Sequence, residues 1–369
     1  MSSRGGPDLL PGATKGRAPR VCIGMPVFNC IRYVARSAQS LLNQTFEDFE
    51  LLIVDNASTD GTFEFVRSLN ADPRVRVVRN ERNIGAIPNF IKVLSLARGE
   101  YFMWAPGDDF WEPKFVALLV KELDQHPNAG VAMSATRRIR EDGKTLDVVS
   151  YHGRHDPNKL GPLRLALELG KATKLNLFIN GLFRRPLLQE LCRQFPDGGA
   201  PERILLAQLA LAREFRYVNH ILYKRQLHLI KHHERYPDEP YSRNEALGII
   251  GDLQFVGSLS VALARSTVVP SHRKLYTPLI ALSFLSTRIG GRWALAHRDS
   301  IKRSRRQMRR QRRQLWKLSR RKARRLRNIL FRLPRTLGIV FRRFRMAFHQ
   351  SKKRTKGMLY RLLKPLSPF

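Results

Sequence analysis

Two adjacent carboxylates, Asp108 and Asp109, follow an apolar run that extends from Tyr101 to Pro106. A strand that stops at two acids places oxygen ligands at the carboxyl edge of a sheet, where open α/β sheets bind their ligands. Two acids so close repel each other unless a cation or hydrogen bonds compensate. Because Mg²⁺ prefers one or two carboxylates plus phosphate oxygens, the pair predicts a divalent metal with a diphosphate. The alternative, compatible with the first, is an N-terminal cap for a helix beginning near residues 111–113.

Apolar strands and amphipathic helices alternate along the part of the chain that would position these acids. Such alternation indicates crossover connections and a mostly parallel sheet covered by helices. After residue 136 the alternation weakens, and a hairpin-like turn is predicted at residues 141–144. The predicted strands are residues 21–27, 49–54, 75–78, 101–104, 130–134, 175–183 and 215–222, and the predicted helices are residues 31–43, 62–69, 87–97, 115–123, 202–212, 244–264 and 275–285.

The composition bounds the class of protein and its compartment. With 369 residues and 43% hydrophobic content, the chain can bury one large core or two smaller ones. Its three cysteines form no close pair, which favours a reducing compartment without a disulfide framework. Residues 1–19 are rich in Gly, Pro, Ser and Arg, and this predicts a disordered leader rather than a secretion signal. No run reaches the roughly 18 apolar residues of a spanning helix, so a cytoplasmic protein is expected.

The C-terminal segment, residues 301–369, is strongly basic. It holds 26 Lys or Arg and no Asp or Glu, and so supplies most of the formal net charge of +37. Apolar residues recur in it at three- and four-residue steps, which predicts an amphipathic helix lying on an anionic membrane surface. Nucleic-acid binding, which the charge alone permits, is the less favoured reading, beside a partner-docking helix or a disordered tail.

Several motifs in order resemble the nucleotide-binding half of the family 2 glycosyltransferases. They begin with Met25-Pro26-Val27-Phe28-Asn29 and Val54-Asp55-Asn56-Ala57-Ser58-Thr59-Asp60-Gly61-Thr62, and continue with Asn83-Ile84-Gly85, the Asp108-Asp109 pair and Tyr223-Lys224-Arg225-Gln226-Leu227-His228. The resemblance implies a GT-A fold, which is a Rossmann-like, mostly parallel sheet covered by helices. It also implies inverting transfer of a sugar from a nucleotide-diphospho-sugar to a hydroxyl, assisted by Mg²⁺ or Mn²⁺.

The resemblance also implies roles for individual residues. Asp55 and Asn56 would hold the base and ribose. Many members have Asp-Asp where this chain has Asp55-Asn56, a departure that makes the identity of the base less certain, and UDP- and dTDP-sugars remain the expected donors. Asp108 would bind ribose near the metal, Asp109 would be the direct metal ligand, and His228 would meet the metal or the pyrophosphate. The remaining nucleotide-sugar contacts would come from Pro26, Phe28, Asn83, Gly85 and Arg184.

Several of these residues also have a purely structural reading. Asp55 could serve a turn, Pro26 and Phe28 could pack at a strand end, and Gly85 could supply a positive φ. A lone histidine such as His228 is often structural, and Arg184 could lie on a solvated surface.

The catalytic base is expected at Glu202, which starts a helix before the last core strand, where the family has an acid. Inverting transfer needs a carboxylate that takes the proton of the acceptor hydroxyl. Arg203 beside it could lower the pKa and the basicity of Glu202. The alternative is an acid that only complements the helix dipole.

Together these observations predict a metal-dependent, inverting transferase for cell-surface polysaccharide or lipid-linked glycan, peripheral on the inner face of the cell membrane. The expected organisation is a leader (1–19), a GT-A domain (20–240), a helical subdomain (241–300) and a basic amphipathic tail (301–369). The alternative is a catalytically weakened family member that acts as a basic membrane or nucleic-acid binding module.

Overall fold

A computed structural model describes residues 17–170, 174–193, 201–228 and 248–296 of the chain. The basic segment 301–369 and almost all of the leader lie outside these residues, so the predictions for them are not addressed by the structure. The chain divides into two compact units, residues 1–292 and 293–369, and the account that follows concerns the first.

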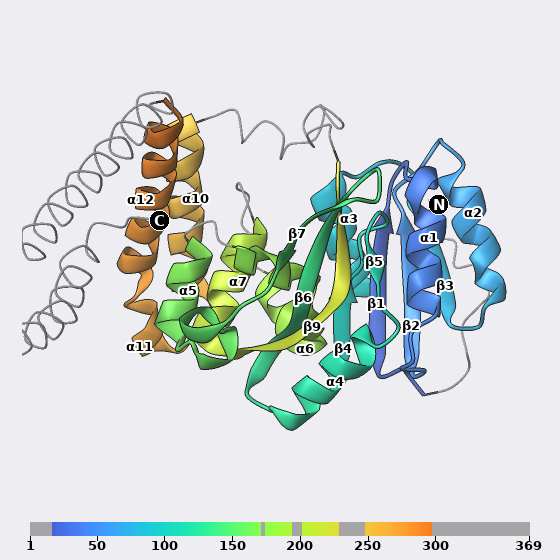
Figure 1. Ribbon diagram of the computed structural model, residues 1–369, viewed down its shortest axis with the longest axis horizontal. Coiled ribbons are helices and arrows are strands. Elements are labelled where there is room, and N and C mark those ends of the chain that lie inside the picture. The colour runs from blue at the N-terminus through green and yellow to red at the C-terminus, as the bar shows by residue number, and fades with distance from the viewer. Residues whose placement is uncertain (1–16, 171–173, 194–200, 229–247, 297–369) are drawn as a thin grey trace, which may run out of the picture. The chain divides into compact units, whose positions relative to one another are not determined.

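The first part of the chain folds as the alternation predicts (Figure 1). Parallel strands adjoin in the order β3-β2-β1-β4, and every residue of β1 is buried, as expected for a strand covered on both faces. The strands are β1 (Val21–Val27), β2 (Phe49–Asp55), β3 (Val75–Arg79) and β4 (Tyr101–Trp104), and the helices are α1 (Ile31–Leu42), α2 (Thr62–Ser68), α3 (Ala86–Leu96) and α4 (Phe115–Gln125).

The second part extends the same sheet with strands of both directions, so that nine strands join within the described residues. Strand β8 is antiparallel to both β4 and β6, whereas β6 and β9 are parallel to each other. The predicted turn at residues 141–144 joins β6 to the antiparallel β7. These strands are β5 (Phe110–Trp111), β6 (Ala129–Arg140), β7 (Thr145–Val149), β8 (Leu182–Arg184) and β9 (Glu214–Leu227).

One predicted strand is wrong, and so is the alternative reading of the acid pair as the cap of a helix that begins near residues 111–113. Residues 174–180 form a 3₁₀ helix, in which Leu175 and Phe178 are buried three positions apart, and only the short β8 follows it. Helix α4 begins at Phe115 rather than near 111, because residues 110–111 pair with β9. The Asp108-Asp109 pair is therefore not the cap of α4.

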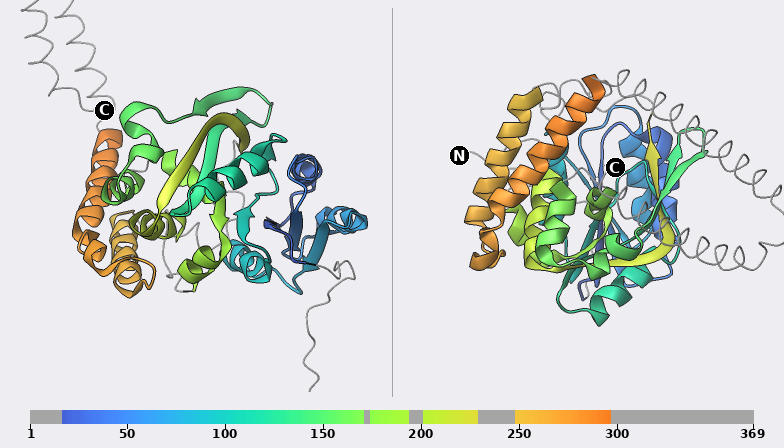
Figure 2. Two further views of the ribbon diagram at one scale, coloured as in Figure 1. Left: turned by 90° about the horizontal axis from the view of Figure 1, so that it is seen from below. Right: turned by 60° about the vertical axis from the view of Figure 1, so that its left-hand side comes forward.

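Helices cover the extended sheet and continue beyond it (Figures 1 and 2). Helix α10 contacts α7, and Arg273 of α11 donates to the Leu211 carbonyl of α7 at 2.8 Å, so the helical segment packs on the same unit. Phe255 of α10 and Phe284 of α12 stack with centroids 3.9 Å apart. These helices are α5 (Pro162–Gly170), α6 (Arg185–Cys192), α7 (Pro201–Ala212), α10 (Gly248–Arg265), α11 (Ser271–Lys274) and α12 (Thr277–Ala296).

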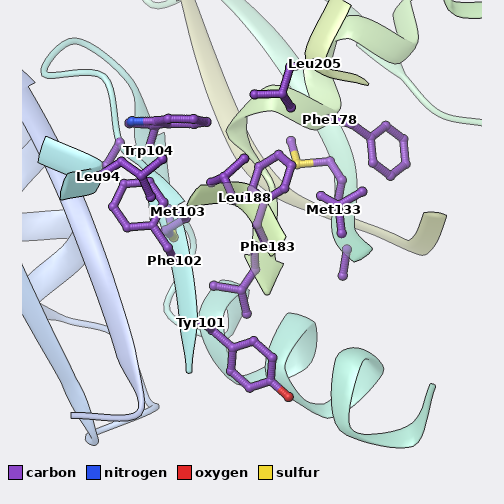
Figure 3. Close-up of a cluster of buried hydrophobic side chains, with 14 of the residues drawn as sticks. Leu94, Tyr101, Phe102, Met103, Trp104, Met133, Phe178, Phe183, Leu188 and Leu205 are labelled. Carbon is purple, nitrogen blue, oxygen red and sulfur yellow. The ribbon is translucent and has the colours of Figure 1, made fainter. Parts of the chain in front are cut away.

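The core lies where the parallel and mixed halves of the sheet meet (Figure 3). Phe183 of β8 packs edge-on against Trp104 of β4, with ring centroids 6.0 Å apart. Both side chains are buried, as are Met133 of β6 and Phe178. Large aromatic side chains contribute much of the buried apolar area of a core, so this cluster fixes β8 between β4 and β6.

Candidate active site

The carboxyl ends of the parallel strands bring the candidate residues to one edge of the sheet. The register pairs Val27 with Asp55 and Asp55 with Arg79, and pairs Gly24 with Trp104, the last residue of β4. The segments that follow β1, β2 and β4 therefore start at the same edge, as the sequence predicts.

Asp55 is fully buried at this edge and has one unused oxygen. Its Oδ2 accepts a hydrogen bond from Ser58 N at 3.1 Å and pairs with Arg79 Nε at 3.3 Å. Its Oδ1 is buried and has no hydrogen-bond partner among the described residues. Burial raises the pKa of Asp55. A buried acceptor without a donor is costly, so this oxygen suits a ligand that brings an N–H or O–H group.

The loops beside Asp55 are held in unusual conformations by mutual hydrogen bonds. Asn29 and Ala57 have positive φ angles of 43° and 62°, a region that few residues other than glycine occupy. Asn29 N donates to Ser58 Oγ at 3.0 Å, and Thr59 N donates to Asn29 Oδ1 at 2.9 Å. The two loops therefore form one braced unit, with Phe28 partly exposed beside it.

Asn56 uses its side-chain amide within the protein. Its Nδ2 donates to Asn83 Oδ1 at 2.6 Å, and its Oδ1 accepts from Asn80 Nδ2 and Ile84 N. Gly85, with a φ of 89°, then leads into α3. Asn56, Asn83 and Gly85 thus lie together at the edge, and the positive φ supports the backbone reading of Gly85. Pro26 is buried within β1, where it pairs with Val54.

Asp108 and Asp109 point into different environments. Asp109 is only 3% exposed; its Oδ2 accepts from the Tyr223 hydroxyl and its Oδ1 from Gln226 N at 2.8 Å. Burial, and then repulsion by Asp108, raise the pKa of Asp109 to about 7. Each Asp109 oxygen is thus occupied by a donor from β9, which disfavours the predicted role of Asp109 as the direct metal ligand.

Asp108 instead faces the imidazole of His228. Asp108 Oδ2 lies 2.6 Å from His228 Nε2, and Glu141 Oε1 lies 2.8 Å from His228 Nδ1. The side chain of Asp108 is 28% exposed and that of His228 is 16% exposed. The structure therefore brings Asp108 and His228 together. Both side chains are partly exposed to solvent, so both could bind a ligand from solution.

Glu202 lies in the first turn of α7, with 29% of its side chain exposed. Burial raises its pKa, whereas its own backbone N–H and the cations Arg203 and Arg225 act in the opposite direction. Arg203 Nε is 4.0 Å from Glu202 Oε1. The positive charge of Arg225 also lowers the pKa of Asp109.

Arg184 lies at the opposite edge of the sheet, so its predicted contact with the nucleotide is wrong. It pairs in register with Tyr101, the first residue of β4, and its guanidinium donates to the carbonyls of Ala129 and Leu123 at 2.9 and 2.7 Å. Strand β8 runs antiparallel to β4, and its last residue therefore emerges at the amino edge.

The sequence interpretation missed several residues of this region. Arg79, Glu141, Tyr223 and Gln226 each contact a candidate residue. Tyr223 and Gln226 stand close to His228 in the sequence, and this proximity could have indicated that they belong to the site. Their partner Asp109, however, lies more than a hundred residues away in sequence. The described parts of the chain hold no group of three or more His, Cys, Asp or Glu arranged to hold a metal ion.

Comparisons with known proteins agree with this fold. Residues 22–192, slightly less than half of the chain, match the model of glycosyl transferase family 2. It is 34% identical over 141 residues to a chondroitin synthase of Escherichia coli, and over 131 residues to a hyaluronan synthase of Pasteurella multocida. These matches cover 38% and 35% of this chain, but only 20% and 13% of those relatives.

The fold is similar to that of a solved bacterial structure. S. aureus TarS 1-349, in a structure described as a complex with UDP-GlcNAc, superposes with a TM-score of 0.54 and 17% identity, over 73% of each chain. The predicted GT-A fold is thus confirmed. Among the described residues, no helix combines the length and apolar character that crossing a membrane requires.

Proposed function

We propose that this protein is a glycosyltransferase that moves a sugar from a nucleotide-diphospho-sugar to an acceptor hydroxyl with inversion. The observation that carries the proposal is the buried, unpartnered Oδ1 of Asp55 at the same sheet edge as the Asp108–His228 pair. The Asp55 oxygen suits the N–H group of a nucleobase, and the Asp108–His228 pair suits the diphosphate end of the same ligand. The match of residues 22–192 to the family 2 model and the polysaccharide synthases among the relatives support the reaction class.

The donor is a UDP- or dTDP-sugar. Uracil and thymine each carry one ring N–H between two carbonyl groups, and a carboxylate oxygen such as Asp55 Oδ1 accepts from such a group. The similar fold of TarS, whose structure is described as a complex with UDP-GlcNAc, is consistent with a uridine nucleotide.

Asp108 and His228 would hold a divalent cation, Mg²⁺ or Mn²⁺. Two adjoining donors with outside access fit a cation that completes its coordination with phosphate oxygens and water. When bound, the cation would offset negative charge on the departing diphosphate. Asp109 would not bind the metal itself. Its hydrogen bonds with Tyr223 and Gln226 N would hold the segment so that the neighbouring Asp108 faces His228.

Glu202 would be the base. Its carboxylate takes the proton of the acceptor hydroxyl while the acceptor oxygen forms a bond to the anomeric carbon. The bond from that carbon to the diphosphate oxygen breaks on the opposite face, and the electron pair leaves with the diphosphate. Partial burial raises the pKa of Glu202 above that of an ordinary glutamate, which makes it a stronger base near neutral pH.

A membrane surface with a glycan or lipid-linked acceptor is the proposed setting. Leu275, in the turn before α12, is 78% exposed, and Leu279 and Leu282 of α12 are 51% and 63% exposed. Ile280 and Phe284 of α12 are buried on the opposite side of the helix. An exposed apolar stripe followed in sequence by 26 Lys or Arg residues suits an anionic lipid interface. The three free, buried cysteines suit the reducing, cytoplasmic side of that membrane.

A turnover assay separates this proposal from the alternative of a weakened member that only binds membrane or nucleic acid. Release of free nucleoside diphosphate would be measured from a panel of UDP- and dTDP-sugars, with polysaccharide acceptors present. Glu202→Gln is expected to reduce turnover by about 10²-fold or more, the typical contribution of a general base, while nucleotide affinity is retained. A folded wild-type protein that turns over no donor, yet binds vesicles, would favour the binding module.

A further inference from the structure

Glu141 meets His228 because of the register between two strands. Arg140, the last residue of β6, pairs with Leu227, the last residue of β9, so the residues that follow each strand lie side by side. Glu141 Oε1 lies 2.8 Å from His228 Nδ1, on the side of the ring away from Asp108. Tyr33 of α1 also donates to Glu141 Oε1 at 3.3 Å.

The side-chain carboxylate of Glu141 makes none of the hydrogen bonds that hold the turn at residues 141–144. Asp142 accepts from Lys144 N at 3.0 Å and from Arg140 at 2.9 Å. Gly143 N donates to the Arg140 carbonyl at 2.9 Å, and Gly143 supplies the positive φ of 77°. The turn is therefore held by neighbours of Glu141, and the recorded hydrogen bonds of the Glu141 carboxylate go to His228 and Tyr33 instead.

We infer that Glu141 is a positioning residue, which orients the imidazole of His228 for the diphosphate–metal end of the donor; this inference rests on the proposed function. A carboxylate accepts but cannot donate, so His228 donates from Nδ1 to Glu141 and from Nε2 to Asp108 in this structure. A cation bound at Nε2 would replace the hydrogen there, and Glu141 would keep the remaining hydrogen on Nδ1. Partners of this kind set the tautomer and ring orientation of metal-binding histidines.

The surroundings also hold the imidazole of His228 in place. The ring of Tyr33 lies 5.2 Å from that of His228 at an angle of 59°. The imidazole is thus supported on one face by an aromatic ring and at Nδ1 by a carboxylate.

The test measures binding of UDP by calorimetry with and without Mn²⁺ in the full chain. Glu141→Ala is expected to weaken Mn²⁺-dependent UDP binding by about 10-fold or more, the usual cost of removing such a partner, without changing UDP binding in the absence of metal. Glu141→Gln keeps an oxygen that accepts from Nδ1 and should restore most of the affinity. Asp142→Ala is the matched control, since it removes the bonds that hold the turn but spares His228.

The outcomes separate this inference from the proposed function. If the wild type shows Mn²⁺-dependent binding and Glu141→Ala binds equally well, the positioning role is wrong and the proposed function stands. Equal losses in Glu141→Ala and Asp142→Ala would also overturn it, because turn integrity would then explain both. If the folded wild type shows no metal-dependent binding at all, the proposed function fails and the inference fails with it.

Discussion

Asp108 and Asp109 are neighbours in the chain, but their carboxylates serve opposite sides of the same segment. Asp109 turns inward, where Tyr223 and Gln226 N of β9 occupy its oxygens, and Asp108 turns outward to His228. The two adjacent acids therefore differ: Asp109 is buried and bonded to β9, whereas Asp108 is partly exposed and paired with His228.

This division predicts different effects on stability. Asp109→Ala leaves the Tyr223 hydroxyl and the Gln226 N–H without their acceptor in a buried site, which should lower the free energy of unfolding by roughly 1–3 kcal/mol. Asp108→Ala, at a more exposed position, should lower it much less. Urea denaturation of the two variants and the wild type checks this, and equal losses would contradict the inward orientation of Asp109.

Asp55 and Arg184, both predicted from the sequence to contact the nucleotide, should differ in binding assays. Asp55→Asn removes the charged acceptor at the edge and should weaken nucleotide binding by about 10-fold or more, as expected for a charge-assisted hydrogen bond. Arg184→Met should leave nucleotide affinity unchanged but lower stability, since it loses bonds to the Ala129 and Leu123 carbonyls. Fluorescent-nucleotide titration and thermal unfolding measure the two effects. Weaker nucleotide binding in a folded Arg184→Met protein would count against the placement of Arg184.

The pH dependence of turnover should report Glu202. A base must be ionised, so kcat/KM should fall as the pH drops through the raised pKa of Glu202. Arg225 stabilises the ionised carboxylate of Glu202, so Arg225→Gln should raise the pKa of Glu202. The acidic limb of the pH profile of kcat/KM should then move to higher pH by about half a unit or more. Arg213→Gln, at an exposed position just after α7, is the control. An acidic limb that stays in place in Arg225→Gln would argue that another group is the base.

Membrane attachment should have a salt-resistant part. At about 1 M salt the Debye length falls to roughly 3 Å, so attraction between surface charges is largely screened. Protein that still sediments with anionic vesicles should be held by apolar contacts, and changing Leu275, Leu279 and Leu282 together to Ser should release it.

A matched control for the leucine stripe lies on β7, where Leu146 and Val148 are 55% and 39% exposed. Changing both of these to Ser should leave sedimentation unchanged. If the triple leucine variant remains bound at high salt, another segment makes the apolar contact. Retention on duplex RNA but not on vesicles would favour the nucleic-acid alternative.

The sequence predicted the parallel half of the sheet and the edge where Asp55 and Asp108 lie, because both follow from local periodicity and strand ends. The direction of β8 depends on its pairing with β4 and β6, which local pattern does not encode, and Arg184 was therefore placed at the wrong edge. The inward turn of Asp109 depends on Tyr223 and Gln226 N. The contact between Glu141 and His228 depends on the β6–β9 register. Both are long-range pairings.

The most direct test of the central claim is calorimetric titration of UDP, dTDP and GDP, each with and without Mn²⁺, into the wild type and Asp108→Asn. We expect UDP or dTDP to bind more tightly with Mn²⁺ to the wild type, by about 10-fold or more, and this gain to disappear in Asp108→Asn. If a folded wild-type protein binds none of the three nucleotides, with or without the metal, the glycosyltransferase account is contradicted.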